Sequence, residues 1–408
     1  MTTETTMTTM TPDEVMALES AHVLQTYRRA PVVFERGSGC RLYDAIGRGY
    51  LDFISGIGVS SLGHAHPKLV AAIAAQAEQL LHTSNLYFHP LQSEAAAKLS
   101  ELSGLPRAFF CNSGTEAVEA CLKFARRYWF SLGAPRPQIV SLERGFHGRT
   151  MGALSTTWDE HYRTPFAPLI DGVTFVSNTD PSQVLAAVSD KTAAIIVEPL
   201  QGEGGVRPLR PEMAAAIKAA CEESGALLIA DEVQCGLGRT GVPFYSSTLG
   251  LQPDLISIGK ALGGGVPVGA ALISARVAAA VSFGDHGSTY GGNLLACRAA
   301  LVFLEELSSG LLAHVAAIGP QIEAALKRVA ARHPSVIEVR GAGVMWGLEL
   351  DRPAAPVVDA ALERGLLINR TADTVLRLLP PYVVDVAAVD QMAVVLDAAL
   401  SAAEGENR

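Results

Sequence analysis

Short, continuous apolar segments alternate with longer segments of helical periodicity through the middle of the chain. The apolar segments lie at residues 108–111, 138–142, 193–197, 226–230 and 255–258. Strands buried on both faces have this continuous apolar character. Because strand and helix patterns alternate, the sequence predicts an α/β fold with a mostly parallel sheet covered by helices.

The clearest helical segment covers residues 115–129. Its apolar positions fall on one face, and Glu119 and Lys123 on the other are spaced for an i,i+4 ion pair. Ser113 and Glu116 match the S-x-x-E capping box, which predicts the start of this helix directly after the strand at 108–111. The first turn of such a helix has free N–H groups that can bind a phosphate.

The pattern changes towards the two ends of the chain. From about residue 311, Ala-rich helical segments surround strand-like segments at 336–339 and 376–379, which predicts a second, smaller α/β lobe. Residues 1–12 are rich in Thr and have no periodicity, so we expect a disordered tail there.

Composition and charge exclude several classes of protein. Of 408 residues, 49% are apolar and only 18% are charged, which excludes intrinsic disorder. The net charge of −9, with no basic block, argues against nucleic-acid binding. No uninterrupted apolar run approaches the ~18 residues of a membrane span, and the N-terminus does not resemble a signal peptide. The six scattered cysteines form no C-x-x-C pair, so we expect reduced thiols in a cytoplasmic protein.

A glycine motif after the segment at 226–230 suggests a competing class, the NAD-dependent dehydrogenases. Gly236-Leu-Gly238-Arg-Thr-Gly241 matches the G-x-G-x-x-G pattern of dinucleotide-binding proteins. In those proteins the glycines lead a strand directly into a helix that binds the pyrophosphate. Here residues 231–235 intervene, and the residues after Gly241 lack helical character. The context therefore argues against this class, and a colourless protein stabilised by NAD would reverse the interpretation.

Three features together predict a pyridoxal phosphate site. Lys260 follows an apolar strand and precedes three glycines, an environment suited to a partly desolvated Schiff-base lysine. Asp231 ends another apolar strand, where a carboxylate needs a partner such as a pyridinium nitrogen. The helix start at Ser113 is a candidate phosphate site. The combination is far more specific than any one of the three.

Further motifs extend the interpretation to nearly the whole chain. They include Leu62-Gly-His-Ala-His-Pro67, Phe110-Cys-Asn-Ser-Gly-Thr-Glu116, Phe146-His-Gly-Arg149, Glu198-Pro-Leu-Gln-Gly-Glu203, Asp231-Glu-Val-Gln234 and Gly259-Lys260. From about Tyr27 to the C-terminus, the sequence resembles the class III aminotransferases, which are pyridoxal phosphate enzymes of fold type I. The resemblance implies a large cofactor-binding domain over residues 56–305. It also implies a small α/β domain built from both chain ends, residues 13–55 and 306–408.

The resemblance implies a role for each site residue. Lys260 would hold the cofactor as a Schiff base and move the proton, while Asp231 would keep the pyridine nitrogen protonated. The other cofactor contacts are expected from Ser113, Gly114, Thr115, Phe146, Val233 and Gln234, and from Thr289 of the partner subunit. Arg149, with Ser288 nearby, would bind the carboxylate of an acylated ω-amino acid. Arg377 would bind the α-carboxylate of glutamate or 2-oxoglutarate, and Glu203 would pair with it when the other substrate is bound.

The implied reaction moves the δ-amino group of N-acetylornithine to 2-oxoglutarate, in a homodimer with shared active sites. The products would be N-acetylglutamate 5-semialdehyde and glutamate, a step of arginine biosynthesis. Succinyldiaminopimelate, succinylornithine, ornithine and 4-aminobutyrate stay open as alternative donors. His64, His66 and His147 are expected to have structural or packing roles. No metal site is expected, because no cysteine or carboxylate cluster at zinc spacing accompanies them.

Overall fold

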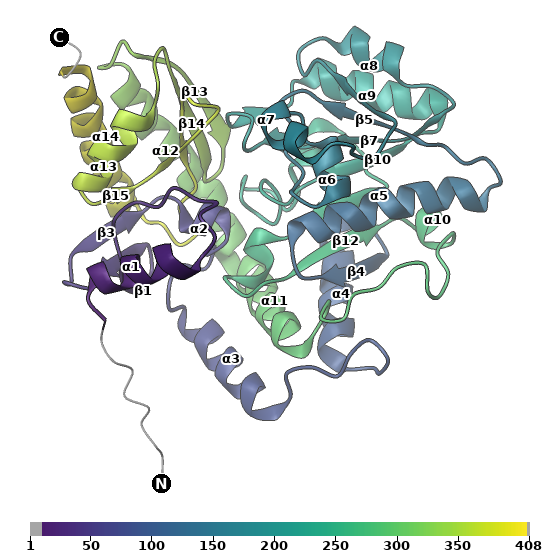
Figure 1. Cartoon of the computed structure of the whole chain (residues 1–408), viewed down its shortest axis with the longest axis horizontal. Coiled ribbons are helices and arrows are strands. Elements are labelled where there is room, and N and C mark those ends of the chain that lie inside the picture. The colour runs from purple at the N-terminus through teal and green to yellow at the C-terminus, as the bar shows by residue number, and fades with distance from the viewer. Residues whose placement is uncertain (1–9, 406–408) are drawn as a thin grey trace.

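The computed structural model describes residues 10–405, so residues 1–9 of the expected tail lie outside the described part. Two parts of the molecule lie side by side (Figure 1). The larger part contains the main sheet, and in the smaller part strands from the beginning and the end of the described chain pair with each other. The described chain begins with α1 (Pro12–His22), whose first turn is capped by Thr11.

Within residues 10–405, the main sheet has seven strands in the order β4-β12-β11-β10-β7-β5-β6. Their bounds are Arg107–Cys111 (β4), Gly269–Ile273 (β12), Leu255–Ile258 (β11), Leu227–Asp231 (β10), Thr192–Val197 (β7), Gln138–Leu142 (β5) and Val173–Val176 (β6). β12 is antiparallel to both of its neighbours, and the other strand pairs are parallel. The prediction of a mostly parallel sheet is therefore confirmed.

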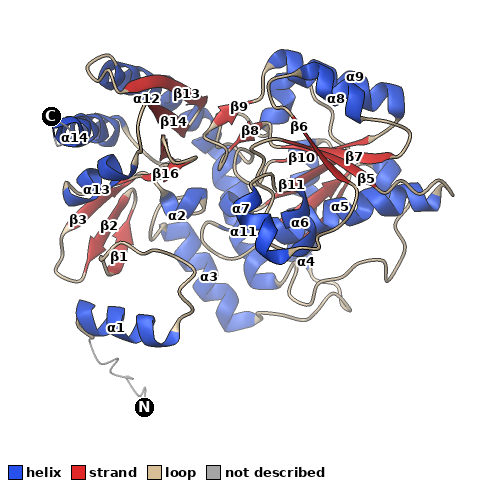
Figure 2. Cartoon of the chain, turned by 45° about the horizontal axis from the view of Figure 1, so that its top comes forward, coloured by secondary structure: helices blue, strands red, loops and turns tan. Residues whose placement is uncertain are grey.

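The central strands are apolar throughout because helices cover both faces of the sheet (Figure 2). In β7, Ala194 and Ile196 pack in one cluster with α5 (Gly114–Ser131). Ile195 and Val197 point to the opposite face, where α8 (Pro181–Ala187) and α9 (Pro211–Ser224) lie. The period-two alternation of a strand sends successive residues into different apolar layers. The remaining helices of this part are α3 (Pro67–Gln79), α4 (Pro90–Ser103), α6 (Met151–Thr156), α7 (Glu160–Arg163), α10 (Ala275–Ala278) and α11 (Leu294–Glu306).

The smaller part has two four-stranded sheets within the described residues. One joins β1 (Phe34–Ser38), β2 (Arg41–Asp44) and β3 (Gly49–Asp52) to β15 (Leu366–Leu367), which pairs with β3 in parallel. The other has the order β13 (Val336–Ala342), β14 (Met345–Leu350), β17 (Val375–Leu378) and β16 (Asn369–Thr371). Helices α12 (Leu312–Ala330), α13 (Ala355–Glu363) and α14 (Val386–Gly405) complete this part, and α2 (Ser55–Gly58) connects it to the larger one. A two-stranded ribbon of β8 (Leu200–Gln201) and β9 (Arg207–Pro208) lies between them.

The start of α5 has only half of the predicted capping box. The Ser113 hydroxyl accepts a hydrogen bond from the Glu116 N–H at 3.3 Å. The Glu116 carboxylate accepts instead from the Asn112 N–H at 2.6 Å, one residue earlier than the box requires. The predicted pairing of Glu119 with Lys123 is wrong. Glu119 accepts from the Gly152 N–H of α6 at 2.7 Å, and Lys123 contacts His286 at 2.8 Å, because tertiary partners replace the local one.

Two helical stretches have the length and composition of a membrane span, Leu294–Ala330 and Val386–Gly405. The first is broken at Gly310, inside a π-helical turn between α11 and α12. Leu301, Phe303, Leu396 and Leu400 from these stretches are buried in one core cluster. Both stretches therefore contribute apolar core of the kind found in globular proteins.

Candidate active site

Asp231 and Lys260 come together at the carboxyl edge of the main sheet. Asp231 ends β10, and Lys260 follows β11 by two residues. The two strands pair in parallel with Asp231 opposite Ser257, so their ends lie side by side. A chamber of about 270 Å³ is lined there by Gly114, Thr115, Phe146, His147, Gly148, Arg149, Glu198, Asp231, Val233, Gln234 and Lys260. Ligands of α/β proteins bind at this edge of the sheet.

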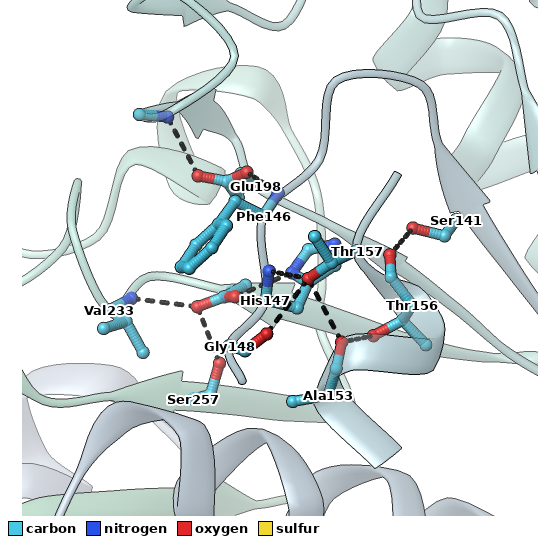
Figure 3. Close-up of polar contacts among 12 residues, drawn as sticks. Ser141, Phe146, His147, Gly148, Ala153, Thr156, Thr157, Glu198, Val233 and Ser257 are labelled. Carbon is cyan, nitrogen blue, oxygen red and sulfur yellow. Dashed lines mark hydrogen bonds and ion pairs between the residues drawn. The ribbon is translucent and has the colours of Figure 1, made fainter. Parts of the chain in front are cut away.

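Three donors hold the Asp231 carboxylate in place, and they come from His147, Val233 and Ser257, which Figure 3 labels. His147 Nδ1 lies 2.7 Å from Oδ2, and Oδ1 accepts from the Ser257 hydroxyl at 2.9 Å and from the Val233 N–H at 3.2 Å. Asp231 is only 4% exposed, so its carboxylate is held in a nearly dry site. His147 Nε2 is buried and has no hydrogen-bond partner among residues 10–405. His147 therefore does more than pack, because its ring contacts the Asp231 carboxylate directly.

The other two histidines have the structural positions expected of them. His64 Nε2 lies 2.7 Å from the buried Asp52 carboxylate. His66 caps the first turn of α3, where its ring nitrogen accepts from the Leu69 N–H at 3.4 Å.

Glu198 is a chamber residue to which sequence reasoning assigned no role. One carboxylate oxygen accepts from the Phe146 N–H at 2.8 Å and the other from the Gly202 N–H at 2.9 Å. Burial raises the pKa of Glu198 to about 7, with a further rise from Asp231 and an opposing effect of His147. The sequence feature that could have identified Glu198 is its place at the start of the motif that ends in Glu203. The position of this carboxylate after an apolar strand does not show from which backbone N–H groups it accepts hydrogen bonds.

The N-terminus of α5 opens into the chamber. Gly114 and Thr115 are its first two residues and line the wall, and the N–H groups of a first helical turn have no acceptor within the helix. The Thr115 hydroxyl lies 2.9 Å from that of Thr150. A Cβ at Gly114 would come within 2.5 Å of Val233 Cγ1, so glycine is required by space at this position. Ser113 caps the helix and is not itself among the lining residues.

Lys260 is half-buried in the chamber wall, and burial lowers the pKa of its amine. Glu203 and the carboxylates of Glu198 and Asp231 oppose this decrease, while Arg377 adds to it. Phe146 and Val233 both contribute apolar surface to the walls, and Gln234 contributes an amide. The chamber therefore combines a partly buried amine, a buried carboxylate and a set of helix N–H groups.

Arg377 reaches the site from the smaller part of the molecule. It lies on β17 and is 1% exposed. Its Nη1 lies 2.5 Å from Glu203 Oε1 and 3.2 Å from Gln234 Oε1, and its Nε donates to Asn369 at 3.2 Å. Burial alone would raise the pKa of Glu203, but Arg377 and Lys260 lower it. The predicted pair of Arg377 and Glu203 is thus formed next to Lys260.

Arg149 lines the same chamber with a guanidinium that has no carboxylate partner among the described residues. It lies 3.7 Å from the centroid of the Tyr162 ring. Ser288 and Thr289 are not brought to the chamber of their own chain. Ser288 Oγ accepts from the Gly291 N–H at 3.0 Å, and Thr289 is exposed.

An outer chamber of about 550 Å³ adjoins the inner one at Phe146. Tyr162 and Trp158 line it from the larger part, and Arg370 and Thr371 line it from the smaller part. Glu203 is also in its wall, so the pair of Glu203 and Arg377 lies at the edge of this outer chamber. A substrate tail that does not fit beside Lys260 has room in this outer chamber.

Residues 23–400 match the model of the family described as aminotransferase class-III. The acetylornithine aminotransferase of Methanocaldococcus jannaschii is 45% identical over 390 residues, which cover 95% of this chain and 98% of that protein. The ornithine aminotransferase of Toxoplasma gondii, solved with partial occupancy of PLP at its active site, superimposes with a TM-score of 0.93 at 31% identity. That alignment covers 97% of this chain and 95% of that one. The acetylornithine aminotransferase of Elizabethkingia anophelis has a TM-score of 0.85 at 28% identity, over 96% and 99% of the two chains.

Proposed function

The chain belongs to the class III aminotransferases and is a pyridoxal-phosphate-dependent transaminase, and we propose that it moves the δ-amino group of N-acetylornithine to 2-oxoglutarate. The products are N-acetylglutamate 5-semialdehyde and glutamate, and the reaction belongs to arginine biosynthesis in the cytoplasm. The pair of Arg377 and Glu203 beside Lys260 is the observation that carries this proposal.

The chamber fits pyridoxal phosphate. The open N–H groups at Gly114 and Thr115 suit the phosphate, and the Asp231 carboxylate suits the pyridine nitrogen. Phe146 and Val233 supply apolar walls for a planar ring, and Gln234 supplies a hydrogen-bonding group. When bound, the cofactor withdraws electrons from the substrate carbon that loses its proton.

Lys260 acts as the covalent anchor and as the general acid and base of the reaction. Burial lowers the pKa of its amine, which increases the fraction that is unprotonated and able to take a proton near neutral pH. Asp231, held by His147 and Ser257, would pair with the ring nitrogen of the bound cofactor. Glu198 fixes the Phe146 backbone and the loop that carries Glu203 through its two accepted hydrogen bonds.

The two half-reactions need different carboxylate contacts. Glutamate and 2-oxoglutarate have an α-carboxylate next to the reacting carbon, and the Arg377 guanidinium can bind it in bidentate fashion after leaving Glu203. N-acetylornithine presents a terminal amine, and the reacting carbon has no neighbouring carboxylate for Arg377 to bind. Arg377 therefore stays paired with Glu203, so its buried positive charge keeps a negative partner. Its distant carboxylate reaches Arg149, which has no carboxylate partner among the described residues.

A single-turnover experiment tests the donor. The colour of the bound cofactor is followed after mixing with N-acetylornithine, succinylornithine, succinyldiaminopimelate, ornithine, 4-aminobutyrate or glutamate. We expect N-acetylornithine to be the best ω-amino donor, and Lys260→Ala to lose both catalytic turnover and the covalent cofactor adduct trapped by borohydride. A faster reaction with another ω-amino donor would replace N-acetylornithine in the proposal.

The active site is proposed to be completed in a homodimer. Asn85 donates to the carbonyls of Ser288 and Gly291, at 3.1 and 2.9 Å, so the segments 85–88 and 288–291 lie together. Large apolar side chains are exposed in and near these segments, namely Leu86, Tyr87, Phe88, Phe283 and Tyr290. Such a patch suits a second copy of the chain, to whose phosphate site Thr289 would be presented. Sedimentation of the enzyme should give a dimer, and a monomer with full activity would exclude this arrangement.

A further inference from the structure

The glycine motif at residues 236–241 surrounds an arginine that the reaction does not use. Arg239 is fully buried, and none of the ion pairs among residues 10–405 gives its guanidinium a carboxylate partner. Its Nε has no hydrogen-bond partner in the described part of the chain. Burying a cation without a counter-charge is costly, so its other contacts must compensate for the lost water.

Backbone carbonyl groups surround the Arg239 guanidinium. Nη1 donates to the Pro380 carbonyl at 2.5 Å and has a longer contact of 3.5 Å with the Val344 carbonyl. Nη2 donates to the Gly58 carbonyl at 3.2 Å. The ring of Tyr382 lies 4.5 Å from the guanidinium carbon. The planar fork of arginine can span several acceptors in this way, which the point charge of lysine cannot.

The three carbonyl groups come from separate segments of the chain. Pro380 follows β17, the strand that carries Arg377, by two residues. Val344 lies in the turn between β13 and β14, and its N–H donates back to the Arg239 carbonyl at 2.9 Å. Gly58 ends α2, the loop-like helix that connects the two parts of the molecule. Arg239 therefore joins the larger part to two segments of the smaller part, at Val344 and Pro380, and to the connecting helix α2 at Gly58.

The glycines of the motif allow this close approach. Gly238 has a φ of +91°, and a Cβ there would come within 2.6 Å of Leu307 Cδ1. Gly343, across the junction, has a φ of +55°, and a Cβ there would lie 2.5 Å from the Arg239 carbonyl oxygen. Both positions combine a left-handed backbone with a lack of space, so packing rather than nucleotide binding accounts for the pattern.

Arg239 and Arg377 cross the same junction in opposite directions. Arg377 extends from the smaller part to Gln234 and Glu203. Arg239, five residues after Gln234 in the sequence, extends from the larger part to the carbonyl group of Pro380, close behind Arg377. We propose that Arg239 is a positioning residue that sets where the Arg377 guanidinium stands relative to Lys260, and thereby determines affinity for the α-carboxylate substrate. This inference rests on the proposed role of Arg377.

The test compares the two half-reactions in the holoenzyme of Arg239→Lys. This substitution keeps the positive charge but removes the planar guanidinium that spans several carbonyl groups. Single turnovers with glutamate depend on Arg377, whereas those with N-acetylornithine leave it paired with Glu203. Because misaligning Arg377 weakens a hydrogen bond between two charged groups, we expect the dissociation constant for glutamate to rise about tenfold. The constant for N-acetylornithine should stay within about twofold of the parent value.

Tyr382→Phe is the matched control in the same buried cluster. It removes the hydrogen bond from the Tyr382 hydroxyl to the Leu237 carbonyl at 3.1 Å, together with the interaction of that hydroxyl with Arg239, and keeps the three carbonyl contacts of the guanidinium. We expect a lower melting temperature with an unchanged dissociation constant for glutamate. Arg377→Lys tests the proposed function separately, because unaltered glutamate binding in that variant would reject the role of Arg377 itself.

An equal rise in the dissociation constants for glutamate and N-acetylornithine in Arg239→Lys, or no rise in either, would overturn the proposal. Should Arg239→Lys fail to fold, Ser55→Ala decides the question. Ser55 donates to the Leu379 carbonyl at 2.6 Å, beside Pro380 in the same junction. A selective loss of glutamate binding in Ser55→Ala supports the positioning of Arg377 through this junction, and a parallel or absent loss rejects it.

Discussion

Substitution of Gly114 by alanine tests whether the chamber wall is as tightly packed as the structure indicates. The new Cβ would lie 2.5 Å from Val233 Cγ1 and 2.9 Å from Cγ2, about 1 Å closer than an ordinary contact. Val233 is β-branched and has little freedom to rotate. It must therefore move within the chamber, into the space that we propose for the cofactor ring between Val233 and Phe146.

The expected loss follows from the usual cost of overpacking. Extra atoms in a packed site cost about 1–3 kcal/mol. If Val233 can relax only when the chamber is empty, this cost appears as weaker cofactor binding, by about 5- to 150-fold. Stability of the apo-protein should change less than cofactor affinity, because Val233 can relax into the empty chamber and the helix-propensity gain of alanine over glycine, about 1 kcal/mol, applies to helix interiors rather than to the first residue of α5. The substitution thus separates cofactor affinity from stability.

The assay is titration of the cofactor into the apo-protein, followed by its absorbance, with thermal melting measured in parallel. Gly405→Ala is the control, since Gly405 has open space around its Cβ position and lies at the end of α14. The double variant Gly114→Ala with Val233→Ala should bind the cofactor better than Gly114→Ala alone, because it removes the colliding methyl groups. Cofactor affinity of Gly114→Ala within twofold of the parent, or no relief in the double variant, would refute the reasoning.

Three further substitutions probe ionisable groups with defined partners. His147→Phe removes a partner of the buried Asp231 carboxylate, so cofactor affinity measured by titration should fall about tenfold. Burial raises the pKa of Glu198 from 4.5 to about 7, so the folded state loses stability as pH rises through this range. The melting temperature of Glu198→Gln apo-protein, relative to the parent, should therefore be higher at about pH 8 than at about pH 5. Burial alone would raise the pKa of Glu404, but hydrogen bonds from Ser335 and His333 lower it. Its stabilising contribution is lost as pH falls, so Glu404→Gln should lower the melting temperature more at about pH 7 than at about pH 4.

Each of these expectations has a contradicting result. Unchanged cofactor affinity in His147→Phe would mean that Ser257 and the Val233 N–H suffice to hold Asp231. A pH-independent difference between Glu198→Gln and its parent would place the titration of Glu198 outside this range. A larger effect of Glu404→Gln in acid than at neutral pH would reverse the sign assigned to its contacts.

Local sequence determined most strands of the main sheet. The five apolar segments all became strands, with bounds within one residue of the structure, because strands covered on both faces need no polar positions. β12 was not predicted, since Gly269-Ala-Ala-Leu-Ile273 has residues of low strand propensity. Its place between β4 and β11 decides its conformation, through pairing on both sides.

The sequence by itself determined which chemical groups are available, namely the amine of Lys260, the carboxylate of Asp231, the helix start at Gly114 and the guanidinium of Arg377. Their types and their positions at strand ends and helix starts follow from local patterns. Only the tertiary structure decided their burial, their pKa shifts and their hydrogen-bond partners. His147 meets Asp231 across 84 residues, and Arg377 meets Glu203 across 174. Hydrogen bonding, burial and charge act through space over a few ångströms, so such contacts and the raised pKa of Glu198 depend on how distant segments pack.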